Sequence, residues 1–228
     1  MTSYLVATTK HWNLAAFERR RSELPGTWAI VTHRSDLTMD LLIALRPRYI
    51  FFFHWSWIVP QEVLEHTECV CFHMTDVPFG RGGSPLQNLI VRAKKETMLT
   101  ALQMTSQIDA GPVYMKQPLS LEGPARRIFA IAADQCVDMA RQIAITVPQP
   151  VPQSGPVTEF RRRTPEESRL PGEGSLEKLY DHIRMLDAES YPGAFVDHGD
   201  YRITFTEARL DNCVLNASVA IRQRRGKA

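Results

Sequence analysis

The stretch "VCFHMTDVPFGRGGSPLQNLI", from Val70 to Ile90, decides how the fold is read. It begins with a short apolar run typical of a buried strand, and His73 lies at the end of that run. The chain then enters a loop rich in proline and glycine and continues as a helix from Leu86. A strand, a loop and a helix in this order are typical of an α/β fold.

Apolar strands alternate with amphipathic helices through the first half of the chain. The predicted strands cover residues 4–9, 27–33, 48–55 and 69–74, and the predicted helices cover 13–24, 36–47 and 60–67, with Asn13 as the N-cap of the first helix. This alternation predicts an α/β, doubly wound, Rossmann-like and mostly parallel sheet.

The second half of the chain has a different pattern of predicted helices and strands. The pattern predicts a helix over 86–99, a hairpin with strands over 99–104 and 113–117, and a long amphipathic helix over 124–145. We therefore expect a main domain over 1–150, a proline-rich linker over 151–174 and a small C-terminal α+β appendage over 175–228. In that appendage, the helix covers 175–187 and an alternating strand covers 201–210.

Composition excludes several classes of protein. The 228 residues carry a net charge of +2, which is too little for a global positive field, so we expect no nucleic-acid partner. The longest apolar run, over 49–60, is too short to span a bilayer, and the N-terminus does not resemble a signal peptide. The four cysteines lack paired metal-ligand spacing. We expect a cytoplasmic chain with no metal and no membrane partner.

Polar and aromatic side chains follow the ends of two neighbouring strands. His54 and Trp57 come at the end of the third predicted strand, and His73 ends the fourth. Ligands of open parallel sheets bind at the carboxyl ends of the strands, and Asp109 lies on a turn that can fold back to that edge. Taken singly, these residues are typical of a structural histidine and a tight turn. Together they indicate acid–base chemistry on a flat ring.

Two motifs carry a resemblance to a known family. "FHMTDVPFGRGGSP" (72–85), followed by "QIDAGPVY" (107–114), resembles the N10-formyltetrahydrofolate-dependent formyltransferases. The resemblance extends over most of the chain. The segments "HWSW" and "GRGGSPLQN" are most similar to small sugar N-formyltransferases of the pseudaminic-acid pathway type and to formylation domains of peptide synthetases.

The resemblance implies which residues form the site. It implies His73 as the catalytic histidine, Asp109 as its aspartate and Cys71 as a further catalytic position. The cofactor N10-formyltetrahydrofolate is expected to contact Ser56, Trp57, Ile58, Gln103, Met104 and Asp109. The acceptor is expected to contact Thr9, Lys10, Asn13, Arg81, Gly82 and Gly83.

Cys71 departs from the family pattern, which has an asparagine two residues before the histidine. A thiol is a weaker hydrogen-bond donor to an oxyanion than an amide. Three interpretations stay open: another donor such as Asn88, His54 or a backbone N–H replaces it, the enzyme is slow or altered, or the chain is a degenerate folate-binding relative. A Cys71 nucleophile ranks last, because the sequence offers it no base of its own.

The resemblance leaves two classes of acceptor open. The compact length and the two segments above favour a small-molecule amine, a nucleotide-linked amino sugar, as the partner. A formyltransferase acting on an aminoacyl acceptor is the alternative, and the basic tail "IRQRRGKA" (221–228) is interpreted as a solvated end rather than an RNA-binding arm. The oligomeric state is open, with a homodimer as one arrangement.

Overall fold

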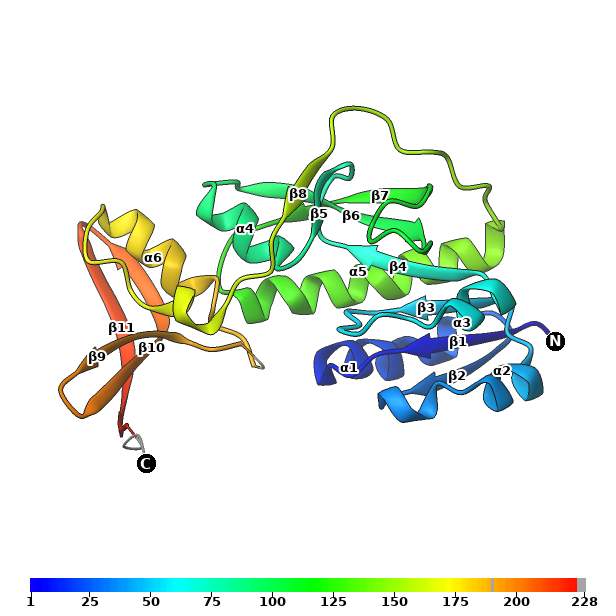
Figure 1. Cartoon of the computed structure of the whole chain (residues 1–228), viewed down its shortest axis with the longest axis horizontal. Helices are drawn as coiled ribbons and strands as arrows, with labels where there is room; N and C mark the ends of the chain where they lie inside the picture. Colours follow the sequence, from blue (N-terminus) through cyan, green and yellow to red (C-terminus); the bar gives the residue numbers. More distant parts are fainter. Residues whose placement is uncertain (190, 225–228) are drawn as a thin grey trace. The chain divides into compact units, whose positions relative to one another are not determined.

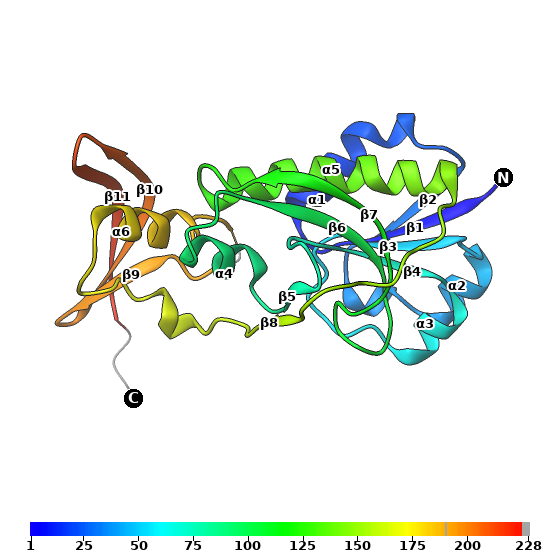
Figure 2. The same ribbon diagram turned by 90° about the horizontal axis from the view of Figure 1, so that it is seen from above.

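A computed structural model describes residues 1–189 and 191–224. The chain divides into two compact units. The first comprises 1–82, 97–119 and 129–159, and the second comprises 83–96, 120–128 and 160–228. Each unit is therefore assembled from three separate segments of the chain. The segment boundaries differ from the predicted domain boundaries, which follow residues 150 and 174. Figures 1 and 2 give two views of the ribbon.

The first unit is built on a six-stranded sheet in the order β2-β1-β3-β4-β6-β7. Its strands are β1 (Ser3–Ala7), β2 (Thr27–Val31), β3 (Tyr49–Phe52), β4 (Cys69–His73), β6 (Glu96–Gln103) and β7 (Val113–Ser120). The pairs β1–β2, β1–β3 and β3–β4 are parallel, whereas β6 runs antiparallel to β4. The predicted Rossmann-like, mostly parallel sheet is confirmed.

Helices cover both faces of this sheet. Figure 2 shows α1 (His11–Arg20) and α5 (Ala125–Thr146) on one face, and α2 (Met39–Leu45) and α3 (Gln61–His66) on the other. The central strand β3 is buried along its whole length, which explains its continuous apolar sequence. Thr38 caps α2 by accepting a hydrogen bond from the Leu41 N–H, so this helix begins three residues later than the predicted start at residue 36.

The second unit contains α4 (Pro85–Val91), α6 (Leu176–Arg184) and a three-stranded antiparallel sheet. The sheet has the order β11-β10-β9, with β9 (Ala194–His198), β10 (Tyr201–Asp211) and β11 (Val214–Gln223). Ser175 caps α6 by accepting from the Lys178 N–H. The predicted C-terminal α+β region is confirmed as a helix with an antiparallel sheet, but only one of its three strands was predicted.

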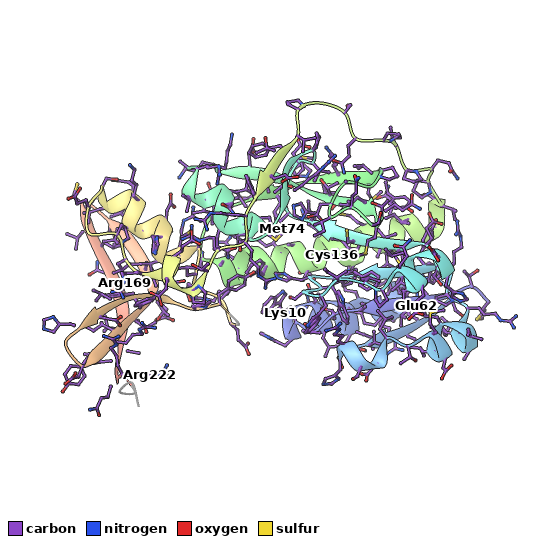
Figure 3. The ribbon with its side chains drawn as sticks, in the orientation of Figure 1. Lys10, Glu62, Met74, Cys136, Arg169 and Arg222 are labelled. Carbon is purple, nitrogen blue, oxygen red and sulfur yellow. The ribbon has the colours of Figure 1, made fainter. Side chains whose placement is uncertain are left out.

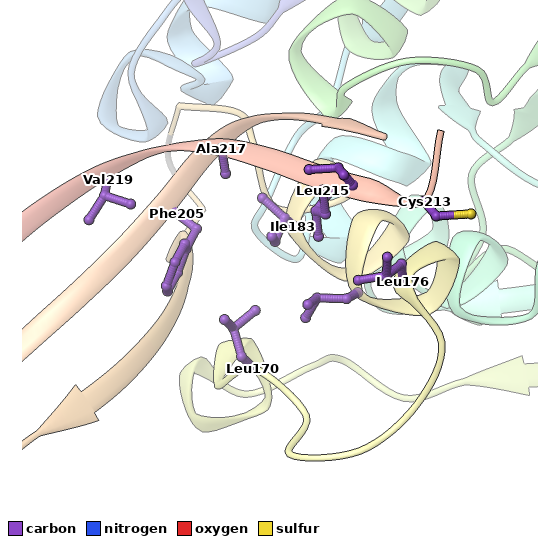
Figure 4. A pocket seen from close by; sticks show the side chains of 10 residues that line it. Leu170, Leu176, Ile183, Phe205, Cys213, Leu215, Ala217 and Val219 are labelled. Carbon is purple, nitrogen blue, oxygen red and sulfur yellow. The ribbon is translucent and has the colours of Figure 1, made fainter. Parts of the chain in front are cut away.

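An apolar hollow of about 460 Å³ lies between α6 and this sheet (Figure 4). Its walls come from the helix side and from β10 and β11. The lining residues are Leu170, Leu176, Leu179, Ile183, Phe205, Cys213, Val214, Leu215, Ala217 and Val219. Only Ile183 among them is buried, and the others are half-buried or exposed, so the hollow is open to solvent.

Three local predictions were wrong. The helix predicted over 86–99 ends at Val91, and Ala93 has a φ of +56°, a left-handed value that cannot continue a helix. The glycine loop and the linker contain two short strands, β5 (Phe79–Gly82) and β8 (Thr158–Phe160), which pair with each other. Asn13 is not an N-cap, because α1 begins two residues earlier and Lys10 occupies the cap position.

Among the described residues, the helices are too short or too polar to span a bilayer. Residues 225–228 of the predicted basic tail lie outside the described residues.

Candidate functional site

His73 ends β4 and is nearly enclosed by protein, with 8% of its surface exposed. Its Nε2 lies 2.8 Å from the carbonyl oxygen of Gly80. Because a carbonyl can only accept, Nε2 is the donor in this bond. The other ring nitrogen, Nδ1, faces Oδ2 of Asp109 at 3.4 Å. The imidazole is therefore oriented by one partner on each nitrogen.

Asp109 lies in the loop 104–112 that joins β6 to β7. This loop starts beside the beginning of β4, where Met104 donates its N–H to the Cys69 carbonyl, and it reaches the end of β4 at His73. Asp109 adopts a left-handed φ of +51°, and its Oδ2 also accepts the Gly82 N–H at 2.9 Å. The convergence of His73 and Asp109 expected from the sequence is confirmed. Their catalytic roles stay a prediction.

The glycine loop supplies backbone groups to this site. Gly80 and Gly82 have φ values of +78° and +100°, a region that glycine enters without steric cost. Gly80 offers its carbonyl to His73, and Gly82 offers its N–H to Asp109. Gly83 belongs to the second unit, where a Cβ would lie 2.5 Å from Cα of Arg162. That close approach explains the third glycine without a ligand, so its predicted contact with the acceptor stays a prediction.

Arg81 extends from the same loop to Gln153. The guanidinium donates from Nε and Nη2 to Oε1 of Gln153, at 3.1 and 2.8 Å. Gln153 lies in the segment that the sequence suggested was a linker, so its place beside the site was missed. Only the proline-rich composition of that segment is visible in the sequence, and it carries no signal for this contact.

Cys71 lies on the same face of β4 as His73, because the two are two residues apart on one strand. Burial, together with the nearby Asp109 carboxylate, raises the pKa of the Cys71 thiol well above its usual value. The thiol is therefore protonated at neutral pH, which makes it a poor nucleophile. This supports the low rank given to a Cys71 nucleophile.

Two of the other donors considered in place of the family asparagine, the Asn88 amide and the Gly82 N–H, are occupied by hydrogen bonds. The Asn88 amide donates to the carbonyls of Gly83, Ser84 and Arg161 within the second unit. His54 packs edge-on against Trp12 and Phe129. The Gly82 N–H is bonded to Asp109.

The residues expected to contact the cofactor divide into two groups. Ser56, Trp57 and Ile58 are exposed, with 82% of the Ile58 surface open to solvent. Gln103 and Met104 are half-buried, and Met104 packs against the apolar cluster beneath α2 and α3. Ile108, next to Asp109, is 67% exposed. Trp57, Ile58 and Ile108 are thus large apolar side chains open to solvent, where a ligand can cover them.

The residues expected to contact the acceptor follow β1. Lys10, labelled in Figure 3, precedes α1, and its ammonium lies over the Trp12 ring at 5.6 Å from the centroid. Asn13 is buried, and its amide donates to Thr8 Oγ1 and to the Phe53 carbonyl. Asn13 thus ties the ends of β1 and β3 together. Contacts of Thr9, Lys10 and Asn13 with an acceptor stay predictions.

Within residues 1–189 and 191–224, no group of three or more His, Cys, Asp or Glu side chains is arranged to hold a metal ion. The site residues gathered at His73 are an imidazole, a carboxylate, a thiol and backbone amides. These groups can transfer protons and stabilise charge at a carbonyl.

Comparison with solved structures identifies the family. A structure described as methionyl-tRNA formyltransferase from Clostridium thermocellum is 42% identical and has a TM-score of 0.94. The match covers 98% of this chain and 100% of that one. The chain belongs to the formyltransferase family. Residues 165–222 of the chain also match the family model of the "Methionyl-tRNA formyltransferase, C-terminal domain".

More distant relatives are consistent with this assignment. The methionyl-tRNA formyltransferase of Rickettsia felis is 27% identical over 190 residues, which are 79% of this chain and 61% of that protein. The chain therefore spans less than two thirds of the length that the Rickettsia protein has. A likely sugar N-formyltransferase from Mycobacterium tuberculosis is 14% identical, with a TM-score of 0.69 over 86% of this chain and 91% of that one, and shares the fold alone.

The acceptor named for these relatives differs from the acceptor expected from the sequence. The family resemblance is confirmed, but the emphasis on sugar N-formyltransferases is not, because 42% identity to a protein named for methionyl-tRNA far exceeds 14% to one named for sugars. The aminoacyl acceptor kept as the alternative fits the relatives better. The expected absence of a nucleic-acid partner loses its support for the same reason.

Proposed function

We propose that this chain transfers a formyl group from N10-formyltetrahydrofolate to the amine of an aminoacyl-tRNA, with methionyl-tRNA as the first acceptor to test. The observation that carries the proposal is the pairing of the enclosed His73 with Asp109 at 3.4 Å. This pairing lies in a chain of the formyltransferase family, at the position where ligands of such sheets bind.

The formyl donor supplies the carbonyl carbon and a nitrogen leaving group. His73 stabilises the negative charge that develops on the formyl oxygen. Its Nε2–H leaves the Gly80 carbonyl and donates a hydrogen bond to the formyl oxygen as that oxygen becomes negative. The ring becomes positive when Nδ1 takes up the proton released by the attacking amine, and Asp109 stabilises that charge from the Nδ1 side. The pair also moves a proton from the attacking amine to the leaving nitrogen.

Residues after β3 fit a flat pterin ring. Trp57 is 39% exposed and packs edge-on against Trp55, with ring centroids 5.2 Å apart. Ile58 and Ile108 add exposed apolar surface in the same unit. Covering these side chains with a ring removes apolar surface from water, which favours binding. We assign the pterin to this surface, with Gln103 and Met104 at its border.

Charge distribution supports a polyanionic acceptor. The second unit carries 17 lysines and arginines against 13 aspartates and glutamates, whereas the first carries 10 against 12. The overall charge of +2 conceals this difference. The segment that matches the methionyl-tRNA formyltransferase C-terminal domain, 165–222, belongs to the positive unit. A cytoplasmic location and the oligomeric state stay predictions.

The test is a formyl-transfer assay on purified protein with three acceptors: methionyl-tRNA, free methionine and a nucleotide-linked amino sugar. We expect transfer to methionyl-tRNA, and a KM for it that rises steeply with salt because phosphate contacts release counterions.

His73→Ala should lower kcat by roughly 100- to 10,000-fold with an unchanged circular dichroism spectrum. His66→Ala is the control, since His66 ends α3 away from the polar site residues.

Two outcomes would contradict the proposal. Formylation of the amino sugar alone, with no salt dependence, would restore the small-acceptor interpretation. Undiminished turnover by His73→Ala would remove the catalytic assignment altogether.

A folate-binding protein without turnover is the second candidate, and Cys71 is the observation that favours it. Loss of an oxyanion donor costs about 100- to 1,000-fold in rate. If Cys71 merely replaces the family asparagine, Cys71→Asn should retain or raise formyl transfer. Tight binding of a folate analogue with no transfer by either protein would favour the second candidate.

A further inference from the structure

We propose that Gln153 is a positioning residue for formyl transfer. Its side-chain amide holds both Asp109 and Arg81 in position. The proposal rests on the function proposed above. It goes beyond that function because Gln153 lies in the segment 147–157, which has the composition of a linker and contains none of the family motifs.

The Gln153 amide uses all of its hydrogen-bonding capacity inside the first unit. Oε1 accepts two bonds from the Arg81 guanidinium, at 3.1 and 2.8 Å. Nε2 donates to the carbonyls of Asp109 and Gly111, at 2.9 and 2.8 Å. An amide has two acceptor sites and two donor hydrogens, so four bonds saturate it. The charged donor on Oε1 also polarises the amide and strengthens the bonds made by Nε2.

The two carbonyls held by Gln153 flank the strained part of the Asp109 loop. Asp109 has a φ of +51°, which is unfavourable for a residue with a Cβ. Such a conformation persists only where the surroundings fix it. The bonds from Gln153 to residues 109 and 111 fix the backbone on both sides of Ala110. They thereby direct the Asp109 carboxylate to His73 and to the Gly82 N–H.

The segment that carries Gln153 is itself anchored at both ends. Val151 exchanges two backbone hydrogen bonds with Val113, the first residue of β7, each 2.8 Å long. Thr158 donates its N–H to the Pro78 carbonyl at 3.1 Å. The segment 151–158 thus connects the start of β7 to the glycine loop, and Gln153 lies between the two anchors.

These contacts predict separate effects on kcat and on KM. Gln153→Met keeps the volume but removes all four bonds, so kcat should fall roughly 10- to 100-fold through Asp109, and the KM for the acceptor should rise through Arg81. Gln153→Glu keeps an acceptor for Arg81 but places a carboxylate against two carbonyls. It should lower kcat to a similar extent and leave the KM near that of the wild type.

The matched control is Gln135→Met. Gln135 lies on α5 in the same unit and donates one hydrogen bond, to the Pro118 carbonyl. Its replacement should leave both kinetic constants unchanged. In a double-mutant cycle, Gln153→Met should have little further effect on kcat in an Asp109→Asn background, because Gln153 acts through Asp109. Additive losses, or equal effects of the two methionine variants, would overturn the proposal.

A readout without turnover separates this inference from the proposed activity. Hydrogen exchange of the Gly82 amide reports the bond to Asp109. Gln153→Met should speed this exchange at least roughly tenfold, and Gln135→Met should leave it unchanged. If the wild-type chain transfers no formyl group yet Gly82 exchange responds as expected, the activity proposal fails and the positioning role survives. If Gly82 exchange does not respond, the positioning role fails.

Discussion

Asp109 in the first unit and Asp197 in the second are carboxylates held by different kinds of contact, although each lies in an antiparallel part of its unit. Asp109 follows β6 and is held by a backbone N–H and an imidazole. Asp197 on β9 is held by the side chains of Arg169, Arg202 and Arg224. Hydrogen bonds and charge from Arg202, with help from the other two arginines, lower the pKa of the Asp197 carboxyl far below its usual value.

The comparison separates a structural carboxylate from a functional one. A carboxylate surrounded by arginines stays ionised at every physiological pH and exchanges no proton. A carboxylate beside an imidazole can stabilise charge that appears and disappears on the ring. The two kinds of anchoring also differ in how much backbone movement they tolerate. Backbone contacts depend on the exact path of a loop, whereas long arginine side chains can adjust to a shift.

The largest effect is expected from moving the backbone beneath Asp109. In Gly111→Ala, the new Cβ would lie 1.8 Å from the Gln103 carbonyl oxygen, so the loop or β6 has to shift. We expect a loss of about 3 kcal/mol in the free energy of unfolding. A fall in formyl transfer should accompany it, since Asp109 moves with the loop. Denaturant titration and the transfer assay measure the two effects.

Gly172→Ala provides the control in the second unit, because a Cβ there would meet nothing within 4 Å. We expect it to be neutral within about 0.5 kcal/mol. Equal stability of the two alanine variants would show that the Asp109 loop tolerates movement. The contrast drawn between backbone and side-chain anchoring would then be wrong.

An intermediate, pH-dependent effect is expected at Asp197. Because the folded pKa lies below the unfolded value of about 3.9, the ionised carboxylate stabilises the fold above pH 4. This contribution is lost as the pH falls through the folded pKa. Asp197→Asn should therefore lower Tm at pH 7, and the difference from the wild type should shrink below pH 4.

Thermal unfolding at pH 7, 5 and 3 measures this difference. Asp200→Asn is the control, since Asp200 is an exposed carboxylate next to β10. A Tm difference for Asp197→Asn that is constant from pH 7 to pH 3 would contradict the assignment of Asp197 as an arginine-held ion.

The sequence predicted those parts of the molecule that depend on local pattern. Continuous apolar runs such as Tyr49–Phe52 indicated strands covered on both faces, and their alternation with helices determined the sheet. His73 was found because it ends one of these strands. Asp109 was found because its turn can fold back to that edge and because it matches the family motif, although no local pattern reveals the contacts that return its loop along β4 to the imidazole.

What the sequence could not reveal depends on contacts between distant segments. Gln153 bonds to residues 42 and 72 positions away, and nothing in a proline-rich stretch predicts that. β9 has only five residues, too few to show an alternation, and β11 has a weak alternation because most of its residues are exposed. The charge of the second unit was concealed since its segments 83–96, 120–128 and 160–228 are separated along the chain.

The smallest effect concerns a left-handed residue outside the site. Cys213 lies in the tight turn between β10 and β11, after Asn212, and has a φ of +65°. Asn followed by Gly is the preferred pair for such a turn. Cys213→Gly should relieve about 1–2 kcal/mol of strain and cost about 0.4–1 kcal/mol through the more flexible unfolded chain. We expect a net gain of about 0.5–1 kcal/mol in the free energy of unfolding.

Cys213→Ala separates strain from packing, because it keeps the Cβ and the strain but removes the thiol that lines the apolar hollow. Denaturant titration should find the glycine variant more stable than the wild type and the alanine variant no more stable. Equal destabilisation by both would mean that thiol packing outweighs the strain. Asp109 has the same backbone conformation, but replacing it with glycine removes the carboxylate that His73 faces. Strain at Cys213 is therefore removable, whereas strain at Asp109 is tied to the proposed chemistry.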